Sequence, residues 1–85
     1  MEYILLNQAT KNAIRLQSIG LVLGTPAGEI KNGDVLLWNF GLKTRVIEIL
    51  RETEKTITIK EKTIGASFVG ERKMAKKRLV CILKQ

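Results

Sequence analysis

The stretch "IKNGDVLLWNFG", Ile30 to Gly41, predicts the strand on which the fold depends. Asn32-Gly33 favours a tight turn, and the run from Asp34 to Phe40 that follows it is typical of a β-strand. Since successive side chains of a strand point to opposite faces, one face would carry Leu36, Trp38 and Phe40 and the other Val35, Leu37 and Asn39. Both faces are apolar in the first half of the run, which predicts a strand buried on two sides.

The aromatic end of this strand has two interpretations. Trp38 can belong to the core, which is the position we expect for it. Alternatively, Trp38 or Phe40 lies at the rim of the fold, where a nucleic-acid base gains about 1–3 kcal/mol by stacking on an aromatic ring and nearby Lys or Arg side chains hold the phosphates. The sequence leaves both stacking candidates open.

Four further strands are expected after this one. "TITIKEK", residues 56 to 62, alternates most clearly, with Ile57, Ile59 and Glu61 on one face. The other three are "KTRVIEILRE" (residues 43 to 52), "SFVGERKM" (residues 67 to 74) and "LVCIL" (residues 79 to 83). Gly70 would mark a bulge or bend. No segment sustains an amphipathic helical pattern for three turns, so the class is mainly β.

The first thirty residues are harder to interpret. Residues 7 to 24, "NQATKNAIRLQSIGLVLG", fit a strand or irregular structure, and "TPAGE" (residues 25 to 29) predicts one helical or 3-10 turn. No repeat or linker appears, and 85 residues make one domain. We therefore expect a single small β-barrel domain in which residues 1–29 form an N-terminal extension and residues 30–83 form the barrel.

The order "GDVLLWNFG…TRVIEI…KTITIK…SFVGERK…LVCIL" resembles Tudor-like and KOW-like members of the SH3-like barrels. The first strand of these barrels often begins with Gly-Asp and carries an aromatic residue just before a Gly-containing loop. The resemblance covers Ile30 to Leu83. It implies a small barrel of about five antiparallel strands with one short turn before the last, and fold likeness does not transfer function.

Residue types that are absent exclude much chemistry. The chain has no histidine and a single cysteine, which argues against a structural zinc site and against Ser-His or Cys-His catalysis. Cys81 is expected to be a small buried hydrophobe. The carboxylates are expected to form exposed cross-strand pairs with Lys and Arg; they are Glu48, Glu52, Glu54 and Glu61. We expect no catalytic residue, no metal ligand, no cofactor and no enzymatic activity.

The net charge of +7 is concentrated in the second half of the chain. Residues 1 to 40 are balanced, whereas residues 41 to 85 hold the whole excess, with its densest part in "ERKMAKKR", Glu71 to Arg78. Such clustering favours a polyanion partner. The cations expected to contact phosphates are Lys60, Lys62, Arg72, Lys73, Lys76, Lys77 and Arg78. On a strand, Arg72 and Lys73 would point to opposite faces.

Two functions remain open. The first is a non-catalytic module that binds DNA or RNA through phosphate contacts. The second is a protein-interaction or assembly module, for instance a small accessory protein of a phage or mobile element, with residues 13–23 as the contact to a larger partner or to another copy. No apolar run is long enough for a membrane span and no secretion signal opens the chain, so we expect no membrane partner and a cytoplasmic location.

Overall fold

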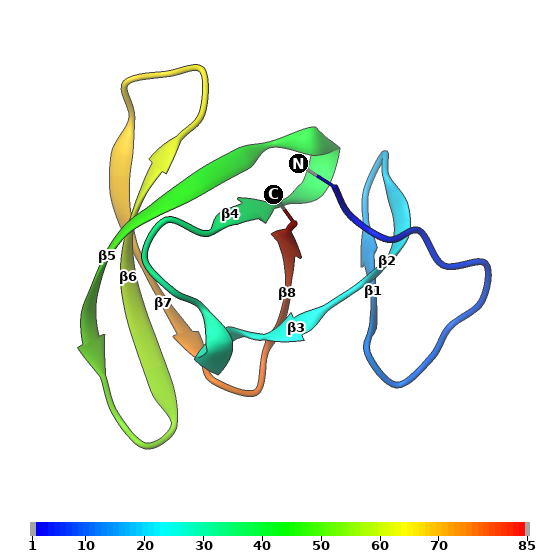
Figure 1. Cartoon of the computed structure of the whole chain (residues 1–85), viewed down its shortest axis with the longest axis horizontal. Helices are drawn as coiled ribbons and strands as arrows, with labels where there is room; N and C mark the ends of the chain where they lie inside the picture. Colours follow the sequence, from blue (N-terminus) through cyan, green and yellow to red (C-terminus); the bar gives the residue numbers. More distant parts are fainter. Residues whose placement is uncertain (1, 85) are drawn as a thin grey trace.

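The computed structural model describes residues 2–84 and is mainly β, as expected (Figure 1). Its strands are β1 (Ala13–Leu16), β2 (Gly20–Leu23), β3 (Thr25–Pro26), β4 (Val35–Leu37), β5 (Lys43–Glu52), β6 (Thr56–Thr63), β7 (Val69–Ala75) and β8 (Leu79–Leu83). Two 3-10 turns accompany them, η1 (Ala27–Glu29) and η2 (Asn39–Gly41). The expected short turn after Thr25 is therefore confirmed, while Thr25 and Pro26 themselves form β3.

The strands form two antiparallel sheets. β1 and β2 make a hairpin, and the other six strands follow the order β3-β8-β4-β5-β6-β7. The expected small barrel of about five strands, preceded by a strand or irregular segment, differs from the structure in two respects: residues 2–84 contain eight strands, and the six-stranded sheet does not close into a barrel but has β3 and β7 at its edges. Two of the three additional strands, β1 and β2, lie in the segment for which strand and irregular structure were left open, and the third, β3, lies at the start of the segment predicted as a turn.

Strand β4 lies in the middle of the six-stranded sheet, between β8 and β5. Its three residues are at most 2% exposed, so the predicted burial on two sides is confirmed. The predicted extent, Asp34 to Phe40, is wrong because the strand ends at Leu37. Phe40 lies in η2 with a φ of 63° and does not continue the alternation of the strand.

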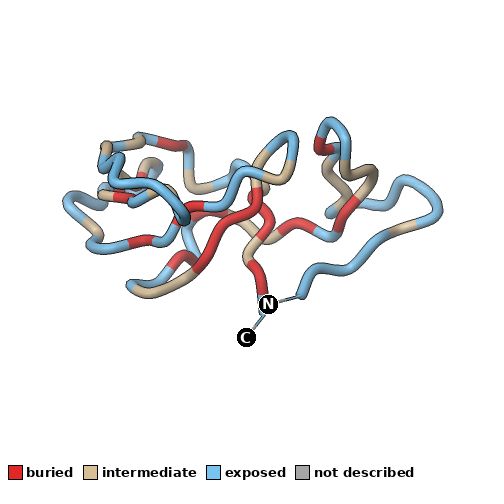
Figure 2. The backbone as a smooth tube through the Cα atoms, turned by 90° about the horizontal axis from the view of Figure 1, so that it is seen from above, coloured by how far each residue is buried: buried red, intermediate tan, exposed pale blue. Residues whose placement is uncertain are grey.

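A separate hydrophobic core lies against each face of β4. Leu36 belongs to the main core, in which β4 to β8 and η1 bury their apolar side chains. Val35 and Leu37 belong to a second core, which Leu16 and Val22 of the β1–β2 hairpin complete. The hairpin therefore covers the second face of β4, while residues 2–12 run mostly exposed beside it (Figure 2).

Strands β5 and β6 are the two longest strands of the six-stranded sheet. The alternation predicted for β6 is confirmed, since Ile57 and Ile59 are fully buried. Of the bulge or bend predicted at Gly70, the bulge is wrong, because the β6–β7 ladder keeps an unbroken register. The irregularities lie in β5 instead, between Val46 and Glu48 and between Ile49 and Arg51. No helix within residues 2–84 has the length and apolarity needed to cross a membrane.

Candidate nucleic-acid interface

A groove of about 480 Å³ opens between the β1–β2 hairpin and the six-stranded sheet. Leu37 and the first residues of β8 line its apolar part. Around them stand three arginines from different parts of the chain: Arg15 on β1, Arg72 on β7 and Arg78 in the turn before β8. Trp38 and Phe40 line it as well. The residues that form this groove are far apart in the sequence and meet only because the hairpin packs against β4 and β8.

Trp38 lies where the main core meets this groove. Its partly buried side chain packs against the main core. The guanidinium carbon of Arg72 lies 4.1 Å from the centroid of the indole ring, and that of Arg78 lies 5.7 Å from it. Both are within the range of a cation–π interaction. Trp38 thus combines parts of both interpretations: it supports the core and it positions cations at the groove.

Four side chains form a closed set of contacts behind the groove. The indole Nε1–H of Trp38 donates to Oγ1 of Thr44 at 2.8 Å. The Thr44 hydroxyl donates to Oε1 of Glu61 at 2.9 Å, and Nε of Arg72 donates to the second oxygen of that carboxylate at 2.9 Å. Because Arg72 also covers the Trp38 ring, the position of each side chain depends on the other three.

Glu61 is the member of this set that was assigned wrongly. An exposed cross-strand pair was expected for it, but its residue exposure is 8%. The alternation of β6 places Glu61 on the same inward face as Ile57 and Ile59. A buried carboxylate is costly unless it is paired and hydrogen-bonded, and here it accepts from both Thr44 and Arg72. Glu61 therefore holds Arg72, which lines the groove, in place from the core side.

Phe40 is displayed on the rim of the groove with 70% of its surface exposed. Its φ of 63° is in the left-handed region, which costs a non-glycine residue roughly 1–2 kcal/mol. Contacts with the β1–β2 turn hold it there: the Phe40 amide donates to the carbonyl of Gln17 at 2.7 Å, and the Gln17 amide donates to the Asn39 side chain at 2.8 Å. Ser18, next to Gln17, also has a positive φ, of 68°. Strained backbone of this kind gathers at binding sites.

The cations expected to form one patch are divided among three places. Arg72 and Arg78 line the groove with Trp38 and Phe40. Lys60, Lys62 and Lys73 project from the opposite, outer face of β6 and β7, which confirms that Arg72 and Lys73 point to opposite faces. On this face Lys60 has Glu71 and Glu48 as its cross-strand neighbours, so the outer face carries mixed charge.

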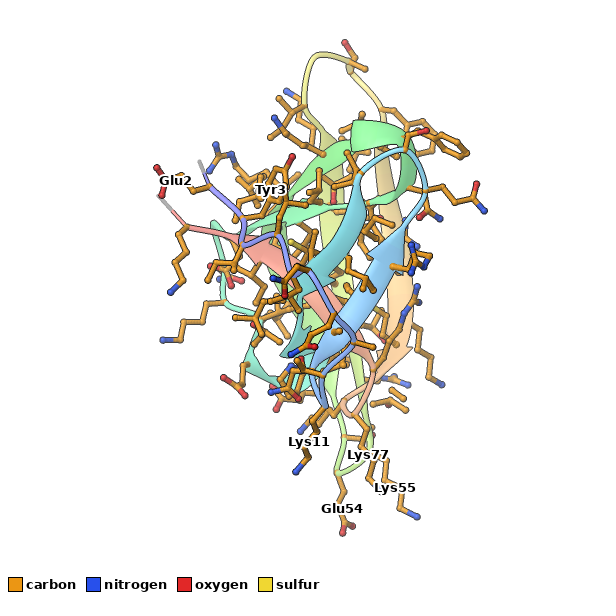
Figure 3. The ribbon with its side chains drawn as sticks, turned by 90° about the vertical axis from the view of Figure 1, so that its right-hand side faces the viewer. Glu2, Tyr3, Lys11, Glu54, Lys55 and Lys77 are labelled. Atoms are coloured by element: carbon orange, nitrogen blue, oxygen red, sulfur yellow. The ribbon has the colours of Figure 1, made fainter. Side chains whose placement is uncertain are left out.

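The last two expected cations lie at one end of the molecule. Lys76 forms an ion pair with Glu52 at 2.7 Å. Lys77 is exposed at the same end, where it gathers with Lys55 and Glu54 (Figure 3). Neither residue lines the groove. Of the densest cationic segment, Glu71 to Arg78, only Arg72 and Arg78 therefore line the groove together with Phe40.

Three residues of the site were not expected from the sequence: Arg15, Thr44 and Glu61. Arg15 lies in the half of the chain with balanced charge, and only the pairing of β1 with β2 and their packing on β8 bring it to the groove. The burial of Glu61 could have been predicted from the alternation of β6, which places this residue on the same face as Ile57 and Ile59. No sequence pattern indicated the role of Thr44, which is 2% exposed, because this role follows from the strand register that places Thr44 near Trp38 and Glu61.

The electrostatic character of the groove follows from its lining. Among the described residues that line it, three are arginines and none is Asp or Glu. The guanidinium of Arg72 is compensated by Glu61, whereas neither Arg15 nor Arg78 has an ion pair within residues 2–84. Such a groove suits an anion that also presents a flat apolar ring. Comparison of the chain with protein-family models, with curated proteins and with solved structures finds no match.

Proposed function

We propose that this protein is a non-catalytic module that binds nucleic acid in the groove between the β1–β2 hairpin and the six-stranded sheet. The observation that carries the proposal is the meeting of Arg15, Arg78 and the exposed ring of Phe40 around one groove without an acidic lining residue. Phosphates would contact the two arginines, and a base would stack on Phe40.

The position of Phe40 favours single strands over duplexes. Bases in a duplex already stack on one another, whereas an unpaired base presents a free face to an aromatic ring. The better-placed aromatic is Phe40 and not Trp38, because the Arg72 guanidinium lies over the Trp38 ring. Trp38 would act indirectly, by holding Arg72 and Arg78 at the groove.

The order of the strands supports an SH3-like arrangement for the second part of the chain. Strands β4 to β8 follow the order β8-β4-β5-β6-β7, so the last strand pairs with the first, while the sheet stays open between its edges β3 and β7. The two register shifts in β5 are consistent with a bent sheet, because a β-bulge bends the strand that carries it. Strand β3 occupies the outer edge of β8 in this chain.

A non-catalytic role is consistent with the groups at the groove. The chain contains no histidine, and the charged side chains that line the groove are arginines. Arginine keeps its proton under physiological conditions and does not act as a general base. The single thiol of the chain belongs to Cys81, which lines the groove but is only 1% exposed. Burial raises the pKa of this thiol, which makes it a poor nucleophile.

Fluorescence anisotropy with labelled oligonucleotides tests the proposal. Single-stranded and duplex DNA and RNA are titrated with the protein at several salt concentrations. We expect tighter binding to single strands, with the logarithm of the affinity falling against the logarithm of salt by roughly 0.7 for each phosphate contacted. An absence of binding at low salt would show that the positive charge only keeps the protein in solution.

Matched substitutions separate the groove from the overall charge. Arg78→Gln removes one positive charge from the groove, and Lys62→Gln removes one from the outer face. We expect Arg78→Gln to weaken binding about tenfold and to reduce the salt slope by about 0.7, while Lys62→Gln changes both much less. Equal effects of the two changes would contradict the groove assignment.

The alternative, a protein-interaction module, is favoured by a different surface. Ile4 and Leu5 are 46% and 61% exposed, and Leu5 bridges to Val22 of the hairpin. Exposed apolar side chains grouped in this way occur at protein contacts. The expected interaction segment itself, residues 13–23, folds back as β1 and β2 and buries Leu16 and Val22. Recovery of one specific protein partner, together with no affinity for nucleic acid, would favour this alternative.

A further inference from the structure

Strand β7 forms an exposed edge of the six-stranded sheet. It pairs with β6 on one side, and no strand within residues 2–84 pairs with its other side. Four of its seven residues are exposed: Val69, Glu71, Lys73 and Ala75. An edge strand of this kind can pair with a strand of another chain unless its side chains prevent it. The side chains along β7 therefore determine which partner strand can pair with it.

The hydrogen bonds at both ends of β7 show which backbone groups face outward. The Lys76 amide donates to Lys55, and the Thr63 amide donates to the carbonyl of Phe68. In an antiparallel ladder, residues that bond to the neighbour alternate with residues that do not. Given the unbroken register with β6, the residues whose backbone groups point away from β6 are Val69, Glu71, Lys73 and Ala75. The carbonyl of Ala75 already accepts from the Arg78 amide at 3.0 Å, so the part of the edge that remains for a partner strand runs from Val69 to Lys73.

These four residues restrict how β7 can pair with the β7 of a second copy. A two-fold axis requires that if residue i faces residue j of the partner, j also faces i. Among the central registers, an axis at Glu71 or at Lys73 places two like charges opposite each other. An axis at Arg72 places Glu71 opposite the partner's Lys73 twice, which pairs opposite charges directly across the strands.

Arg72 itself would lie at the axis, opposite its counterpart. Its side chain is on the inner face, whereas Glu71 and Lys73 are on the outer face. The guanidinium is turned onto Trp38 at 4.1 Å and is bound to the Glu61 carboxylate at 2.9 Å. The charge that would otherwise repel its counterpart is therefore compensated within each chain, and the repulsion at the axis is reduced.

We infer that β7 is a self-association edge: a second copy of this chain pairs antiparallel with it in the register centred on Arg72, and two six-stranded sheets join into one. Self-complementary charge at Glu71 and Lys73 selects this partner. The surface is separate from the apolar segment of residues 13–23, and its charge pairs at Glu71 and Lys73 lie on the outer face of β7, whereas Arg15 and Arg78 line the groove.

Sedimentation velocity over a range of protein concentrations tests the association. Because the paired edge is short, association is expected to be weak, and the series should extend to about 0.5 mM. The natural chain should approach twice the mass of one chain at the upper end. A mass of one chain at every concentration would overturn the inference.

A charge exchange tests the register. Glu71→Lys and Lys73→Glu each place like charges opposite each other across the axis, so each should abolish the dimer, whereas the double substitution Glu71→Lys/Lys73→Glu should restore it. Lys62→Gln on the same outer face serves as the control and should leave the dimer intact. Circular dichroism establishes that each variant is folded before its mass is interpreted. A dimer that survives both single changes, or that the double change does not restore, would show that the contact lies elsewhere.

Discussion

The guanidinium carbon of Arg72 lies 4.1 Å from the centroid of the Trp38 ring. The same guanidinium is bound to the buried carboxylate of Glu61, so Arg72 connects the aromatic wall of the groove to the core. Its charge is compensated inside the protein, which leaves Arg15 and Arg78 as the groove cations available to an outside anion. The groove thus separates two tasks: Arg72 maintains its shape, and the other two arginines supply its charge.

Breaking the Arg72–Glu61 pair should destabilise the fold. Arg72→Met keeps an aliphatic chain against Trp38 but leaves the buried carboxylate without its cation. We expect a loss of about 2 kcal/mol, below the range of roughly 3–5 kcal/mol for fully buried pairs because the Arg72 side chain is 35% exposed. Urea unfolding followed by circular dichroism measures it. The double change Arg72→Met/Glu61→Gln should cost less than the sum of the single changes; additive losses would show that the two side chains are not coupled.

Gly24, between β2 and β3, should not tolerate a side chain. A Cβ at this position would lie 3.0 Å from Cβ of Leu79 and 3.2 Å from the carbonyl oxygen of Asn12, and neither atom moves easily. Gly24→Ala should therefore cost about 1–3 kcal/mol. Gly70→Ala is the matched control, because the nearest atom there is the tip of the exposed Phe68 ring, which can rotate away. Equal thermal stability of the two variants would contradict this packing.

The strands that the sequence predicts correctly are those in which side-chain alternation and burial agree. In β6 the sequence "TITIK" places two isoleucines on one face, and both are fully buried. The same alternation placed Glu61 inward. The expectation that a carboxylate lies at the surface outweighed it, although Arg72 on the neighbouring strand supplies the partner that makes burial possible.

The groove itself could not be predicted because long-range packing creates it. Arg15 comes from a segment with balanced charge and reaches the groove only through the hairpin. Phe40 was placed on a strand because the apolar run continues through it, yet the backbone turns after Trp38, and the bonds from Gln17 that hold this turn connect residues 22 to 23 positions apart. Local patterns do not report such contacts.

The thiol of Cys81 should make stability depend on alkaline pH. Burial raises its pKa above the ordinary value of 9.0. The folded protein therefore keeps a proton that the unfolded chain loses, so the contribution is fully present below pH 9 and is lost as pH rises through the folded-state pKa. Free energies of unfolding measured from pH 7 to pH 10 should fall more steeply for the natural chain than for Cys81→Ala. Parallel curves would show that the thiol does not contribute.

Phe40→Gly should separate stability from binding. Glycine adopts a φ of 63° without the strain that phenylalanine bears there, and a ring that is 70% exposed contributes little packing. The free energy of unfolding should therefore stay the same or rise by up to about 1 kcal/mol. Binding to single strands should weaken by about tenfold, the equivalent of losing one stacked base.

Phe68→Ala is the control for this change, because Phe68 is 71% exposed but does not line the groove. It should leave the affinity for single strands nearly unchanged. Thermal unfolding and anisotropy on the same samples give both quantities. If Phe40→Gly destabilised the protein and left binding intact, Phe40 would be a packing residue of the hairpin contact, and the strained turn would serve the fold. If both phenylalanine changes weakened binding equally, the stacking surface would extend beyond the groove along the inner face of β7.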